Sequence, residues 1–147
     1  MKEEVGREFQ TAFWAAKRAM REATEAAFHR YGVRGGQEFI LRCLWEKDGL
    51  TPGEIARHWD LATPTVTRAA MRMEAAGLLA RRPDPNDGRL VRLYLTERGR
   101  RLRTPLVEEM RRLSERTLAG LTREEQADTV RILQRILRNL TEDRGGR

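Results

Sequence analysis

The run from Ala62 to Arg68, ATPTVTR, places three threonines and one arginine at the start of a predicted helix. An arginine can donate bidentately to O6 and N7 of guanine, a threonine hydroxyl can pair with a donor or an acceptor, and its methyl can touch the thymine methyl. Thr65 and Arg68, with Thr63 and Thr67 beside them, fall where such helices reach base edges in the major groove. A plainer interpretation stays open here: the threonines only cap the helix, and Arg68 is a solvated charge.

Two short helices must position this run. Thr51 can cap the first helix, Pro52 suits its first position, and Glu54 can close a capping box. Residues 60–62 are too few for anything but a tight turn. Thr63 and Pro64 repeat the signal of a cap followed by proline, so a second helix begins at once and runs to Gly77. Two helices joined in this way predict a helix-turn-helix.

A hairpin is predicted directly after the second helix. Residues 78–82 read as a short strand, residues 83–88 are dense in turn formers, and residues 90–95 alternate as a second strand before Thr96 caps another helix. Between Ala62 and Arg103 there are ten arginines and four acidic residues. An arginine-rich hairpin beside a helix-turn-helix is typical of a winged DNA-binding module.

The wing residues carry a family resemblance. Asp87-Gly88-Arg89, followed after five residues by Leu95-Thr96, closely resembles the wing signature of the MarR family of winged-helix regulators. The run from Met73 to Arg81 resembles the Leu-Glu-x-x-Gly-Leu-Ile-x-Arg segment of the same family. At Gly88 the family more often has arginine, so we expect either a looser wing tip or one phosphate contact fewer.

The resemblance implies roles for particular residues. Pro64, Thr65 and Arg68 fall where family members contact the major groove, and Arg89, held by a salt bridge to Asp87, would reach the minor groove, most favourably where A·T-rich steps narrow it. Arg72 and the other wing arginines are expected on phosphates, which position without specifying. The DNA-binding residues predicted here are Thr63, Pro64, Thr65, Thr67, Arg68 and Arg72 in the recognition helix, and Arg81, Arg82, Asp87, Arg89 and Arg92 in the wing.

The outer helices complete the predicted fold, which is mainly α with the order α-α-α-α-β-β-α-α. Residues 1–147 form one MarR-like chain: residues 36–96 hold the DNA-binding region, and the long amphipathic segments 5–30 and 97–141 resemble dimerisation helices. The resemblance implies a homodimer, whose recognition helices about 34 Å apart would match a pseudo-palindromic operator.

Two details of the C-terminal half are less regular. Pro105 falls inside the helix that Thr96 opens, so that helix must either bend or break. Thr122 and Glu125 form a second capping-box signal, which predicts the start of the last helix.

Composition limits the classes of function. The chain has 147 residues, a net charge of +7 and a pI near 10.6, which favours an anionic partner, and no apolar run is long enough for a membrane. The first residues include acids and no apolar segment, so a cytoplasmic location is expected. No metal-ligand spacing, phosphate loop or catalytic carboxylate pair is visible, so we predict no enzyme, no metal and no cofactor. A winged-helix module that docks acidic proteins without sequence-specific DNA binding remains an alternative.

Regulation is suggested mainly by the resemblance, which implies a repressor that releases DNA when a small, often phenolic, anion binds. The effector residues predicted from location alone are Phe13, Trp14, Arg18, His29 and Trp45. A thiol-redox response through Cys43 is the other alternative, although Cys43 lies on an apolar helical face and its thiol is expected to ionise poorly.

Overall fold

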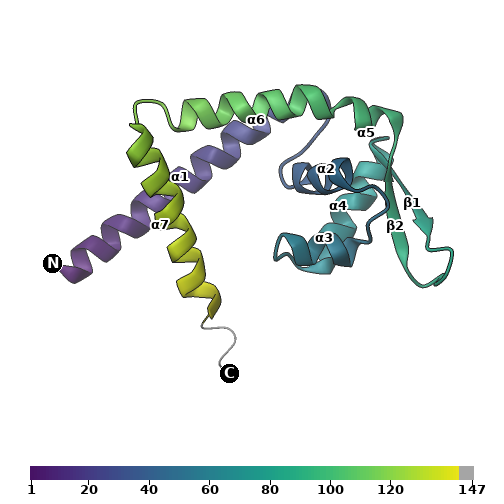
Figure 1. The fold of residues 1–147 in the computed structure, drawn as a ribbon, viewed down its shortest axis with the longest axis horizontal. Helices are drawn as coiled ribbons and strands as arrows, with labels where there is room; N and C mark the ends of the chain where they lie inside the picture. Colours follow the sequence, from purple (N-terminus) through teal and green to yellow (C-terminus); the bar gives the residue numbers. More distant parts are fainter. Residues whose placement is uncertain (143–147) are drawn as a thin grey trace. The chain divides into compact units, whose positions relative to one another are not determined.

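The computed structural model describes residues 1–142 and is mainly helical with one small antiparallel sheet (Figure 1). The predicted winged-helix fold is confirmed, with an added 3₁₀ turn and one predicted helix divided in two. The elements are α1 (Lys2–Phe28), η1 (His29–Tyr31), α2 (Gln37–Glu46), α3 (Pro52–His58), α4 (Thr63–Ala75), β1 (Leu79–Pro83), β2 (Val91–Leu95), α5 (Glu97–Arg101), α6 (Arg103–Thr117) and α7 (Arg123–Glu142). The chain divides into two compact units, Met1–Leu113 and Ser114–Arg147.

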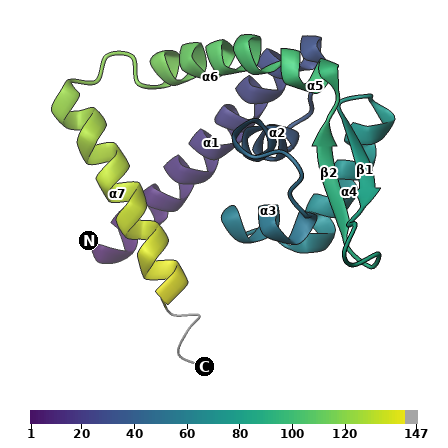
Figure 2. The ribbon, with the colours of Figure 1, turned by 45° about the vertical axis from the view of Figure 1, so that its right-hand side comes forward.

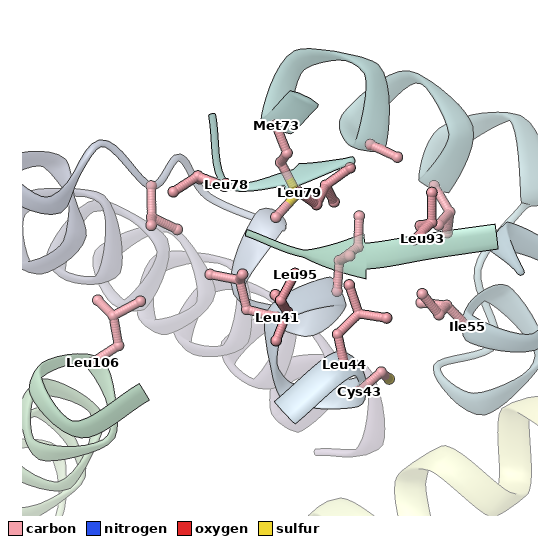
Figure 3. Close-up of a cluster of buried hydrophobic side chains, with 14 of the residues drawn as sticks. Leu41, Cys43, Leu44, Ile55, Met73, Leu78, Leu79, Leu93, Leu95 and Leu106 are labelled. Carbon is pink, nitrogen blue, oxygen red and sulfur yellow. The ribbon is translucent and has the colours of Figure 1, made fainter. Parts of the chain in front are cut away.

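The hydrophobic core lies where α2, α3, α4 and the hairpin meet. Leu41 and Leu44 of α2, Ile55 of α3, Met73 of α4 and Leu93 of β2 are at most 2% exposed. Figure 3 shows these side chains gathered around strand β2. Since each element contributes to one shared core, the core fixes the recognition helix and the wing relative to each other.

Strands β1 and β2 form the predicted wing. They pair antiparallel, with Leu79 opposite Leu95 and Pro83 opposite Val91. Beyond this pairing, Leu93 exchanges 2.9 Å backbone hydrogen bonds with residues 49–50, just before α3. The hairpin lies beside α4 in both views (Figure 2) and is tied to the segment that leads into the helix-turn-helix.

Both predicted capping boxes are present. The Glu54 amide donates to Thr51 Oγ1 at 3.2 Å, while the Thr51 amide donates to the Glu54 carboxylate at 3.1 Å. At the start of α7, Thr122 and Glu125 make the same reciprocal pair at 3.2 and 2.8 Å. Two helix N-termini therefore begin where the sequence predicted them.

The predicted cap of the recognition helix is wrong. Thr63 is the first helical residue, and Ala62, with extended backbone (φ −73°, ψ 133°), is the N-cap without any side-chain hydrogen bond. The turn before it uses a left-handed Asp60 (φ 50°), and the Leu61 amide closes back onto the Ala56 carbonyl at 2.8 Å. This tight turn moves the helix start one residue earlier than the Thr-Pro signal indicates.

Pro105 breaks the helix after Thr96 rather than bending it. α5 ends at Arg101, and α6 begins at Arg103, so Pro105 lies in the first turn of α6. Amide groups in a first turn have no partner within the helix, and proline lacks that amide, so it costs little there.

Helices α1 and α7 each carry apolar side chains that the single chain leaves exposed. On α1, Val5 is 61% and Phe9 is 47% exposed; on α7, which has no buried residue among those described, Leu137 is 61% and Leu140 is 68% exposed. None of the described helices combines the length and apolar character that crossing a membrane requires.

Candidate nucleic-acid interface

Helix α4 buries one side and offers the other to solvent. Val66, Ala70 and Met73 are at most 1% exposed and anchor the helix in the core. On the outer side lie Thr63, Pro64, Thr65, Arg68 and Arg72, all exposed. Among the described residues no carboxylate pairs with Arg68 or Arg72, so both guanidinium groups are available to a partner.

Thr67 differs from the other threonines of α4. Its hydroxyl donates to the Thr63 carbonyl at 3.1 Å, within the helix. The hydroxyl hydrogen is therefore already used, and the oxygen remains as an acceptor only. In this arrangement Thr67 fits a donor group of a base better than an acceptor.

Arg89 and Asp87 form the predicted ion pair at the wing tip. Arg89 Nε lies 3.1 Å from Asp87 Oδ1 and Nη2 lies 3.3 Å from Oδ2, while the Arg89 side chain stays 91% exposed. The hydrogen bonds from Arg89 hold the pKa of Asp87 below its ordinary value. The pair therefore fixes the arginine stem and leaves its outer surface to solvent. A Cβ at the neighbouring Gly88 would meet open space.

Asp84 organises the loop of the wing and is a residue that the sequence analysis missed. Its buried carboxylate accepts the amides of Asn86 at 2.7 Å and Asp87 at 2.9 Å, and it pairs with Arg92. Arg92 also donates to the Gly49 carbonyl at 2.8 Å. The hydrogen bond from Arg92 holds the pKa of Asp84 below its ordinary value. The Asp-Pro-Asn run was a signal for this turn, because aspartate readily accepts amides from the next residues.

The two arginines of β1 also have partners. The Arg81 amide and Nε donate to the Glu74 carboxylate at 2.8 and 3.0 Å, which ties the end of α4 to the wing and lowers the pKa of Glu74. The guanidinium of Arg82 lies over the ring of Tyr94, 5.7 Å from its centre. These contacts restrict the two side chains without burying their charges.

An open hollow of about 520 Å³ separates the recognition helix, the start of α3 and the wing. Arg57, an exposed residue near the end of α3, also lines this hollow, although the sequence analysis did not select it. A cationic hollow of this kind suits a phosphate backbone. The structure brings together here the predicted residues Thr63, Thr67, Arg81, Arg89 and Arg92.

The comparisons with known proteins decide the family. Residues 36–91 match the model of the MarR family. The HTH-type transcriptional repressor Rv2887 of Mycobacterium tuberculosis is 30% identical over 117 residues, which cover 80% of this chain and 84% of that protein. The chain belongs to the MarR family. As a MarR family member it is a transcriptional regulator and not an enzyme.

Two solved regulator structures share this fold. The crystal structure of the transcriptional regulator SlyA aligns with a TM-score of 0.81 and 25% identity, covering 92% of this chain and 95% of that one. A MarR family regulator from Listeria monocytogenes, solved in complex with a 26mer DNA, aligns with a TM-score of 0.78 at 21% identity over 91% of this chain and 89% of that one. The second likeness supports the fold alone.

Of the effector residues predicted for this MarR protein, Phe13 and Trp14 lie together on α1, whereas Trp45 lies on α2. Phe13 lies 5.7 Å from Phe9 and 5.6 Å from Trp14, ring centre to ring centre, while Trp14 itself is 58% exposed. Trp45 lines a second open hollow of about 310 Å³ and donates to the Gly99 carbonyl at 2.9 Å. Phe13, Trp14, Arg18 and His29 do not line this hollow; its lining residues are Leu44, Trp45, Asp48, Leu95, Arg100 and Arg103.

Cys43 of α2 is buried next to Trp59, which follows the end of α3. Trp59 Nε1 donates to its sulfur at 3.0 Å, and burial raises the pKa of the thiol. A protonated thiol is a poor nucleophile, so this environment disfavours oxidation. The predicted burial of Cys43 is confirmed, and the raised pKa agrees with the expectation that its thiol ionises poorly.

Proposed function

We propose that this MarR regulator is a repressor that binds a pseudo-palindromic operator in double-stranded DNA as a homodimer. One observation carries the proposal: the exposed start of α4 and the wing arginine Arg89 flank the same cationic hollow. A duplex presents a major groove with a backbone beside it, and a winged helix-turn-helix uses both.

Residues of α4 would read the sequence and the wing would position the protein. Thr65 and Arg68 are exposed on the first turns and would reach base edges, where a bidentate arginine–guanine pair contributes about 1–3 kcal/mol of discrimination. Arg72 would contact a phosphate, and Arg89 would enter the minor groove with its stem held by Asp87.

Two arginines change roles relative to the prediction from sequence. Arg92 is expected to position the wing through Asp84 and Gly49 rather than to bind a phosphate, since its guanidinium is already engaged on both sides. Arg57 takes its place as an expected phosphate contact, because it is exposed and lines the hollow. Phosphate contacts add affinity without sequence preference.

The exposed apolar faces of α1 and α7 support the homodimer. Each face repeats with helical spacing, and an amphipathic helix is stable when such a face is covered. A two-fold dimer would place two recognition helices about one turn of DNA apart, roughly 34 Å, as an inverted repeat requires.

The proposal includes a response to a small aromatic anion. The hollow at Trp45 supports it, because one tryptophan and two arginines, Arg100 and Arg103, line it. Asp48 also lines it and pairs with Arg100, and Arg103 pairs with Glu46. Benzoate is a suitable probe: it should raise the thermal midpoint of the wild type and lower operator affinity, and the Arg103→Met variant should respond less. An equal response in both proteins would exclude this hollow as the site.

Genomic-fragment selection on the purified protein, followed by gel shifts at two salt concentrations, tests the DNA proposal. Arg89→Ala should weaken binding to all sequences, and Arg68→Ala should relax preference at one base step. Arg101→Ala is the matched control, because Arg101 is exposed on α5 and pairs with Glu97. If no sequence is enriched and all variants bind alike, the chain is a protein-docking module instead.

A further inference from the structure

The C-terminal end of the recognition helix is held by the start of α5. Carbonyls at a helix end lack partners within the helix and need them from elsewhere. Arg98 Nη1 donates to the Ala76 carbonyl at 2.8 Å, Thr96 Oγ1 donates to the Gly77 carbonyl at 2.6 Å, and the Thr96 amide donates to the Leu78 carbonyl at 3.2 Å. Three successive carbonyls after α4 are thus satisfied by two residues.

The backbone of α5 has no room to shift at this junction. A Cβ placed on Gly99 would lie 2.1 Å from the Leu78 carbonyl oxygen, so only glycine permits the approach. The Gly99 carbonyl also accepts a hydrogen bond from Trp45 Nε1. Arg98, the preceding residue, therefore extends from a fixed point.

The same guanidinium also reaches the end of α1. Gly32 closes η1 with a left-handed backbone (φ 73°), and a Cβ placed on it would lie 2.9 Å from Arg98 Nη2. The turn around Gly32 is anchored in the core, because Phe28 and Val33 on either side are each 1% exposed. Arg98 thus donates to the end of α4 with Nη1 and lies with Nη2 beside the Gly32 turn, which follows α1 and η1.

We propose that Arg98 is a positioning residue that couples the end of α1 to the orientation of recognition helix α4. The 13-residue helix is about 20 Å long, so a tilt of roughly 3° at its C-terminal end moves its DNA-facing end by about 1 Å. Base contacts need close alignment, whereas non-specific phosphate binding does not. Arg98 therefore sets the ratio of operator affinity to non-specific affinity, an inference that rests on the proposed DNA binding.

The test compares three variants by their affinity for the selected operator and for a scrambled duplex at one salt concentration. Arg98→Met removes the donors and keeps the aliphatic stem; we expect the operator-to-scrambled ratio to fall about tenfold, as for the loss of one charged hydrogen bond. Arg98→Lys should recover part of the ratio. Arg101→Met loses the same charge from the same helix and should leave the ratio unchanged.

A double-mutant cycle tests the link to α1. Gly32→Ala places a methyl group against Arg98 and also strains a left-handed backbone, and the cycle subtracts the strain. We expect Gly32→Ala to lower the ratio in the wild-type background and to have less effect in Arg98→Met. Additive effects, or equal losses of both affinities together with a lower thermal midpoint, would overturn the coupling. A wild type without any sequence preference would overturn the proposed function itself, whereas a preference unchanged by Arg98→Met overturns only this inference.

Discussion

The winged-helix region buries its apolar side chains within the single chain, whereas the outer helices α1 and α7 leave many of theirs exposed. Every buried hydrophobic residue of the described chain lies between Phe28 and Leu106, and α7 contributes none. The winged-helix region, together with Phe28 of α1, Val33 and Leu106 of α6, therefore closes a core within one chain. The apolar faces of α1 and α7 stay half exposed, which indicates that their burial depends on another surface.

The largest expected effect comes from the closed core. Leu93→Ala should lower the free energy of unfolding by about 2–5 kcal/mol, because Leu93 is 0% exposed and a cavity would remain. Denaturant titration followed by circular dichroism measures it. The matched variant is Leu137→Ala, whose side chain is 61% exposed in the single chain. At protein concentrations low enough to dissociate a dimer, Leu137→Ala should lower the free energy of unfolding far less than Leu93→Ala. Equal losses would contradict the distinction between a core closed within one chain and apolar faces left exposed.

The second prediction concerns the open faces. Leu137→Glu should weaken dimerisation by about thirtyfold, the loss expected at a central apolar contact, while the winged-helix region stays folded. Sedimentation over a range of protein concentrations measures the dissociation constant. Asn139→Glu adds the same charge to a different face of α7 and should change it little. A monomeric wild type, or equal effects of both substitutions, would show that the face of α7 serves another partner.

Local signals explain why several starts and ends of helices could be predicted. Thr51 with Glu54 and Thr122 with Glu125 are each three residues apart, so their spacing determines whether they can meet. The ion pair of Asp87 and Arg89 was expected from the family resemblance. Their contacts are present as predicted. A bend or a break at Pro105 was also expected, because proline restricts the backbone wherever it stands, and the structure has the break.

The contacts that could not be predicted join residues far apart in the chain. Arg92 reaches Gly49, and Arg98 reaches Gly32 and Ala76, only because the core brings these segments together. The sequence shows an arginine-rich wing but not which arginines are already engaged. Arg92 was therefore grouped with DNA contacts, and Arg98 was not selected at all.

The two capping boxes offer a comparison of the same motif in both regions. Thr51→Ala and Thr122→Ala should each lower the free energy of unfolding by about 0.5–2 kcal/mol, with the loss of one amide partner. Thermal unfolding of the two variants measures it. Thr51 is partly buried and Thr122 is exposed, so water can replace the lost cap more easily at α7. A larger loss at Thr122 would show that the start of α7 is covered in the assembled protein.

The smallest expected effect is on the pH dependence of stability, in which Glu38 and Glu108 act in opposite directions because their pKa values are shifted oppositely. Burial raises the pKa of Glu38, whose Oε2 is buried without a hydrogen-bond partner; Glu25 raises this pKa further, and Arg42 and nearby backbone amides lower it. Hydrogen bonds from Arg111 lower the pKa of Glu108 to about 2.

The two shifts have opposite consequences for stability. A raised carboxyl pKa contributes stability below the ordinary value of 4.5 that is lost as pH rises through the folded pKa, so Glu38→Gln should be more stable than wild type at neutral pH and equal to it in acid. A lowered pKa contributes stability above 4.5 that is lost as pH falls towards about 2, so Glu108→Gln should be slightly less stable at neutral pH and converge with wild type in acid. Thermal midpoints measured across this range test both signs. If Glu38→Gln were less stable than wild type at neutral pH, Glu38 would have to be ionised and paired, and the closed region would hold a charge partner that the single chain does not provide.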